Sequence, residues 1–181
     1  MTKIKKILTD KSGKGFPLIL AVVLCCLILS TVVFEYMRLN IIARGVRDSV
    51  QSAIIDVATQ NWDTAYPGLR EGYSGGYQLS GSNWQNNINN GNVYGRVSSV
   101  LGLKNESGKY VKYAGDKLEY TLSGLTLNVE NAPLAPSNIH GITQLNVTGT
   151  IKVQVPLSFG WGHLPMMEIT LRLKSKYVPK F

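Results

Sequence analysis

The sequence predicts an α+β fold in which a long N-terminal helix crosses a membrane, continues as an amphipathic helix and packs on a C-terminal antiparallel sheet. Three observations predict it. Residues 16–34 contain no charged side chain, residues 35–60 place apolar side chains every three or four positions, and residues after 109 alternate between apolar and polar. These patterns are typical of a membrane span, an amphipathic helix and half-buried strands.

The apolar segment FPLILAVVLCCLILSTVVF is long enough to cross a bilayer, because a helix of this length reaches roughly 28 Å at about 1.5 Å per residue. A cleaved secretory signal is the alternative, but the apolar run exceeds the usual core of a signal peptide and no A-x-A-like site follows it. A lipoprotein signal is disfavoured because Leu24 precedes the adjacent cysteines Cys25 and Cys26. We therefore expect a retained transmembrane helix over residues 16–37, with membrane lipid around it.

The distribution of positive charge predicts the orientation of this span. Residues 1–15 carry five lysines and one aspartate, whereas the three arginines of residues 35–50 are offset by Glu35 and Asp48. Positive residues beside a span tend to stay in the cytoplasm. Residues 1–15 are therefore expected to form a basic cytoplasmic leader, and residues 63–181 a loop-rich and β-rich domain outside the membrane.

An amphipathic helix is expected over residues 38–62, joined without a break to the span. Its apolar positions recur at steps of three and four residues: Leu39, Ile42, Val46, Val50, Ala53, Ile54 and Val57. Pro17 suits the first turn of the joined helix, where its missing N–H is harmless. The joined helix is thus predicted from about residue 17 to residue 60.

The remaining chain is expected to be loop-rich first and β-rich afterwards. Residues 61–92 are rich in Gly, Asn, Ser and Tyr without periodicity, so loops are predicted, with short helices near Arg70 and over residues 92–102. A calcium loop is disfavoured, because no carboxylate occurs between Glu71 and Glu106. Strands are predicted in KYVKYA, KLEYTLSGLTLNVE, ITQLNVTGTIKVQVPLSF and MMEITLRLKSKYV. Their single apolar face implies an antiparallel sheet covered by the amphipathic helix.

Catalytic, metal-binding and cofactor-binding chemistry is not indicated. His140 and His163 lie in separate turn regions, and the chain has no His-x-x-x-His helix, cysteine cluster, S-x-x-K or phosphate-binding G-x-x-x-x-G-K motif. A triad built around His163 stays open, but a non-enzymatic protein without a cofactor is predicted. Nucleic acid is not an expected partner despite the net charge of +8, because the bases beyond the leader are scattered among acids.

Residues 14–58 resemble pilin-type proteins. Lys14-Gly15-Phe16-Pro17-Leu18-Ile19 looks like a prepilin peptidase site, and FEYMRLNIIARGVRDSVQSAIIDVA is similar to TadE-like minor pilins, whose membrane helix ends in a Glu-aromatic pair and a basic residue. The resemblance implies a pilin-like fold, cleavage between Gly15 and Phe16, and a place in the bacterial cytoplasmic membrane or a cell-surface pilus. The partners it implies are a prepilin peptidase, other pilin-like subunits and an assembly platform of Tad or type IV type.

One residue departs from this family pattern. Pilins carry a glutamate five residues after the cut, which pairs with the new amine of a neighbouring subunit, and this position is Leu20 here. The resemblance therefore favours a tip or initiating subunit, which has no subunit beyond it to satisfy.

Other candidate functional residues lie at the end of the span and in the body. Glu35, Tyr36 and Arg38 form a candidate assembly or membrane interface, in which Glu35 either pairs with Arg38 or contacts another subunit. Tyr36 suits the headgroup region. Trp84 and Trp161 are candidate partner contacts, with a place in the core as the alternative for Trp161.

Two functions follow as hypotheses. The first is a non-enzymatic, pilin-like structural subunit of a bacterial pilus or secretion assembly, favoured by the KGFPLI segment and the fused amphipathic helix. The second is an anchored extracytoplasmic binding domain that never enters a filament, favoured by Leu20.

Overall fold

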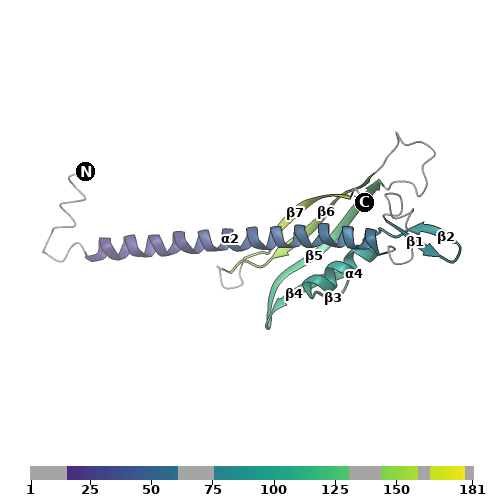
Figure 1. Cartoon of the computed structure of the whole chain (residues 1–181). Coiled ribbons are helices and arrows are strands. Elements are labelled where there is room, and N and C mark those ends of the chain that lie inside the picture. Colours follow the sequence, from purple (N-terminus) through teal and green to yellow (C-terminus); the bar gives the residue numbers. More distant parts are fainter. Residues whose placement is uncertain (1–15, 61–75, 131–143, 159–163, 178–181) are drawn as a thin grey trace. The chain divides into compact units, whose positions relative to one another are not determined.

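The computed structural model of the protein describes residues 16–60, 76–130, 144–158 and 164–177. Helix α2 (Phe16–Thr59) comes first, followed by the short strands β1 (Tyr77–Ser80) and β2 (Asn83–Asn86) and by helix α4 (Asn90–Leu101) (Figure 1). Five further strands complete the order: β3 (Lys104–Glu106), β4 (Lys109–Ala114), β5 (Lys117–Glu130), β6 (Leu145–Val155) and β7 (Met167–Tyr177). The chain divides into two compact units at residues 41 and 42, so the boundary lies within α2.

Helix α2 is continuous from Phe16 to Thr59, which confirms the predicted joining of the apolar and amphipathic segments. Its two halves meet different surroundings. Most of residues 16–37 are exposed, whereas six of the seven predicted core positions in the second half are buried, and Leu39 is half-buried. The apolar periodicity therefore identified the face of α2 that packs on the body.

The larger sheet is an antiparallel meander in the order β3-β4-β5-β6-β7. The four predicted strand segments correspond to β4, β5, β6 and β7, and the alternation predicted their faces correctly. The inward side chains of β6 and β7 that are buried are Leu145, Val147, Ile151, Val153, Val155, Leu171, Leu173 and Ser175. The α+β class, with a long apolar N-terminal helix and a C-terminal antiparallel sheet, is confirmed.

The second half of α2 supplies the cover for this sheet within the larger unit. Val46, Val50 and Ile54 have at most 1% of their surface exposed. Gln51 Nε2 also donates a hydrogen bond of 2.7 Å to the backbone oxygen of Lys174 on β7. Apolar burial therefore supplies the attraction, and the hydrogen bond fixes the helix to one position along the strand.

Helix α4 has defined ends that explain its bounds. The Asn89 side chain accepts a hydrogen bond from the backbone N–H of Asn92, and Gly102 ends the helix in the left-handed conformation with φ 62°. Val93 and Val97, four residues apart, are fully buried. The helix predicted over residues 92–102 is confirmed, with its start two residues earlier.

Two pairings were not predicted. Residues 77–86, expected as loop, form the hairpin β1–β2 around Gly81, and β3 pairs with β4 around Ser107 and Gly108. Gly81, Ser107 and Gly108 all have positive φ, as two-residue hairpin turns require. The strands themselves, YQLS, NWQN and KNE, are short and lack β-branched residues, so their residue types alone give only a weak strand signal. The predicted helix near Arg70 lies outside the described residues.

Gly149 on β6 lies at a close approach of the β5 backbone. The pairing of β5 with β6 shifts register between Ser123 and Thr126. A Cβ atom added at Gly149 would lie 2.0 Å from the backbone oxygen of Thr126. Because that atom belongs to the backbone of a central strand, a side chain at residue 149 would have to move the strands apart.

We therefore expect Gly149→Ala to destabilise the body by about 1–3 kcal/mol. Gly95→Ala is the matched control, because Gly95 lies in α4 with nothing within 4 Å of its added Cβ. There alanine should stabilise by about 0.5–1 kcal/mol through helix propensity. Urea unfolding of the full chain in detergent micelles measures both. Equal stability of Gly149→Ala and the unsubstituted protein would contradict the close approach.

Candidate functional site

The first half of α2 is apolar on every side. Large apolar side chains are exposed from Phe16 to Ile41, and nothing buries the most apolar 18-residue stretch of the helix. A water-soluble helix presents a polar face, whereas a helix surrounded by lipid does not need one. Among the described residues, α2 is the one helix long and apolar enough to span a membrane, consistent with single-pass anchoring.

The hydroxyl groups within this apolar half are satisfied by the helix itself. Ser30 Oγ donates to the backbone oxygen of Cys26 at 2.8 Å, and Thr31 Oγ1 donates to that of Ile28 at 2.7 Å. A polar group in lipid is costly unless it has such a partner. The span therefore presents no unpaired hydroxyl to hydrocarbon at these two positions.

Of the two residues of the predicted processing site, the structure describes Phe16. Phe16 is the first residue of α2 and is 72% exposed, and Pro17 follows it in the first turn. Gly15, the other residue of the predicted processing site, lies outside the described residues.

The Glu35–Arg38 pair is present at the C-terminal end of the apolar stretch. Arg38 Nη1 donates to Glu35 Oε1 at 2.9 Å. Glu35 is only 6% exposed, whereas its neighbours Phe34 and Tyr36 are 70% and 67% exposed. The predicted pairing of these two residues is confirmed, and the exposed Tyr36 ring is free to meet headgroups or another chain.

The two candidate tryptophans fall in different places. Trp84 lies on β2 opposite Leu79 and is half-buried, so it belongs to a hairpin and not to the loop that was expected. Leu79 beside it is 44% exposed. Trp161 lies outside the described residues. The sequence indicated Trp84 by residue type alone. Its position on a strand could be recognised only from the hairpin β1–β2, which was not predicted.

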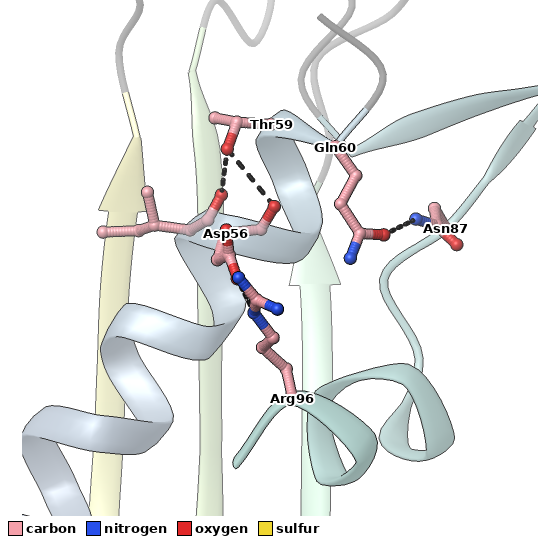
Figure 2. Close-up of polar contacts among 6 residues, drawn as sticks. Asp56, Thr59, Gln60, Asn87 and Arg96 are labelled. Carbon is pink, nitrogen blue, oxygen red and sulfur yellow. Dashed lines mark hydrogen bonds and ion pairs between the residues drawn. The ribbon is translucent and has the colours of Figure 1, made fainter. Parts of the chain in front are cut away.

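The C-terminal end of α2 is fastened by polar contacts that the sequence did not reveal (Figure 2). Asn87 is 8% exposed, and its backbone N–H donates to the backbone oxygen of Gly76. Its side-chain nitrogen donates to Gln60 Oε1 at 3.1 Å, and its side-chain oxygen accepts from the Asn92 side chain at 2.6 Å. Arg96 on α4 forms an ion pair with Asp56 on α2. The contacts span up to 40 residues of sequence, so no local pattern indicates them.

Groups suited to catalysis are few in the described part of the chain. No three His, Cys, Asp or Glu side chains gather there as a metal site. Residues 72–76, GYSGG, have the G-x-S-x-G spacing of a nucleophile elbow. Such an elbow connects a strand to a helix, whereas Gly76 is followed directly by strand β1. Strand β1 therefore stands where a nucleophile elbow would require a helix.

Asn87→Ala should destabilise the protein by about 1–3 kcal/mol, because it removes the two side-chain hydrogen bonds that this buried residue makes with Gln60 and Asn92, each worth about 0.5–1.5 kcal/mol. Asp56→Ala is expected to cost less than about 1 kcal/mol, because both side chains of its ion pair with Arg96 are more than a third exposed to water. Urea unfolding of the two variants gives the comparison. A larger loss from Asp56→Ala would show that the ion pair, rather than Asn87, holds the end of α2.

Comparison with protein-family models, with curated proteins and with solved structures finds no match to this chain.

Proposed function

We propose that the chain is a non-enzymatic, pilin-like structural subunit of a bacterial surface pilus or secretion assembly. The observation that carries this proposal is the single helix α2, whose first half is exposed and apolar on all sides and whose second half covers a sheet. A helix that serves only as an anchor does not need to continue into the body as its main cover. A subunit that packs laterally through its helix does, because one continuous helix then carries both the membrane contacts and the residues that cover the sheet.

The segment around Gly15 and Phe16 supports the same proposal. It resembles a prepilin peptidase site, at which cleavage would leave Phe16 as the new N-terminus. The proposed partners are a prepilin peptidase, other pilin-like subunits and an assembly platform. The body would lie outside the cytoplasmic membrane, with residues 1–15 inside.

A second candidate function is an anchored extracytoplasmic binding domain. Leu20 favours it, because an ordinary shaft subunit resembling this chain would carry a glutamate at that position. Leu20 is 49% exposed in α2 and belongs to the apolar surface around it. Under the first proposal the same residue restricts the chain to a tip or initiating position.

Processing should leave a mature chain that starts at Phe16, found both in membranes and in material sheared from the cell surface. N-terminal sequencing and intact mass of the two fractions measure this. Gly15→Leu should keep residues 1–15 attached, whereas Gly13→Leu, two residues upstream, is the matched control and should be cut normally. A native chain that starts at Met1 or Thr2 in every fraction would overturn the processed-subunit proposal and leave the anchored domain.

Leu20→Glu should raise the amount of this chain in the sheared fraction, because it restores the carboxylate that can pair with the amine of a neighbouring subunit. Leu24→Glu is the matched control: it adds the same charge one helical turn further along, where no amine is expected. Quantitative immunoblotting of sheared and membrane fractions measures incorporation. If Leu20→Glu and Leu24→Glu reduce incorporation equally, the proposal that Leu20 restricts the chain to a tip position is contradicted.

A further inference from the structure

The sheet has an outer face, opposite the buried one, on which polar side chains form rows across β5, β6 and β7. On β7 the alternate residues Arg172, Lys174 and Lys176 are exposed, while Leu171, Leu173 and Ser175 between them are buried. The strand register aligns three consecutive rows: Thr126–Thr150–Arg172, Asn128–Thr148–Lys174 and Glu130–Asn146–Lys176. Each row ends in a cation on β7.

Two adjacent troughs lie between these rows. The first has a volume of about 550 Å³ and is lined by the first two rows together with Leu127, Gly149 and Leu173, the residues between them. The second, of about 230 Å³, lies between the second and third rows. Thr148 and Lys174 line both troughs. The outer face therefore offers a repeated site, with one cation on each side of each trough.

The three cations are not neutralised by neighbouring carboxylates. In residues 16–60, 76–130, 144–158 and 164–177, the ion pairs involve Arg38, Arg96 and Lys152 and none of the β7 cations. Lys152 on β6 is compensated by Glu168 at 3.1 Å. Hydrogen bonds from Lys152 and Gln154 hold the pKa of Glu168 below its ordinary value, so this carboxylate stays ionised. Positive charge therefore remains along the β7 side of the troughs.

One carboxylate does face the rows, and its position limits how a ligand can lie. Glu130 is at the β5 end of the third row, two strands from Lys176, which is about 9–10 Å at normal strand spacing. An anionic ligand would therefore follow β7 and avoid the β5 end of that row.

The spacing of the cations indicates the repeat of the ligand. Alternate residues on a strand are about 6.7 Å apart. A three-bond backbone unit spans 3.3–3.6 Å when extended, so phosphates joined by the six bonds of a P–O–C–C–C–O–P link lie about 7 Å apart. Arg172 is suited to phosphate because its guanidinium binds two oxygens at once.

The residues that line the troughs indicate what joins the phosphates. Hydroxyl and amide groups of Thr126, Asn128, Thr148 and Thr150 can exchange hydrogen bonds with a hydroxylated carbon chain. Among the described residues, no aromatic side chain lines either trough, so the described lining offers no platform for stacking of nucleobases. The chemistry fits a polyol phosphate better than a nucleic acid.

We propose that the outer face of β5, β6 and β7 binds an extended polyol phosphate polymer, with successive phosphodiesters on Arg172, Lys174 and Lys176 and its hydroxyl groups in the two troughs. The inference does not depend on assembly into a pilus. It assigns the body a ligand of its own, in addition to the proposed structural role.

The test uses the full chain in nonionic detergent micelles and a fluorescent synthetic glycerol phosphate hexamer, with binding followed by anisotropy. Arg172→Gln/Lys174→Gln should weaken binding about tenfold or more, since it removes two charge-assisted contacts. Lys109→Gln/Lys117→Gln is the matched control. It removes the same charge from exposed positions on β4 and β5, outside both troughs, and should change affinity less than twofold.

A second variant separates the troughs from simple charge attraction. Thr148→Val keeps every charge and suits a strand, but removes the hydroxyl shared by both troughs, so affinity should fall severalfold. The proposal is overturned if the two double variants lose affinity equally, if Thr148→Val has no effect, or if a thymidine hexanucleotide binds as tightly as the hexamer. Equal affinity for glycerol phosphate monomer and hexamer would also overturn it, because the repeat would then play no part. Circular dichroism melts confirm that each variant is folded.

Discussion

One uninterrupted helix has to be stable in two different surroundings, and the rest of the structure depends on how α2 achieves this. Between its two end turns, the backbone groups of α2 pair within the helix, so this part of the main chain needs no partner from lipid or water. Only the side-chain pattern changes. Up to about Ile41 apolar residues cover every side, and from Ile42 they are confined to one face, where they become the core under the sheet.

The elements predicted from sequence are those set by long periodic patterns. Helix α2 and strands β4 to β7 bury one face each, so spacing alone reveals them, and the local pair Glu35–Arg38 follows from positions three residues apart. The hairpin β1–β2, strand β3 and the contacts of Asn87 could not be predicted in this way. The former depend on turns with positive φ, and the latter join residues far apart in sequence. The rows on the outer face likewise needed the register between strands, which the alternation within a single strand does not give.

The fold separates two kinds of surface on different parts of the chain. The exposed apolar residues before Ile42 are suited to lipid or to other helices, and the polar rows of β5, β6 and β7 are suited to water and to a charged ligand. Both candidate functions use these same surfaces. They differ in whether lipid or other subunits surround the apolar half of α2.

The hydrogen bond between Gln51 and Lys174 joins residues 123 positions apart, and this has a consequence for the order of folding. The strands form a meander of sequential neighbours, which can assemble progressively as the chain emerges. The face of α2 that packs on the strands is synthesised before them. It is fully covered only when β7, the last strand described, has been added. During synthesis the stripe of Val46, Val50 and Ile54 therefore stays uncovered until nearly the whole chain has been made. In that interval the nascent chain would depend on the membrane surface or on a chaperone to keep it from aggregating.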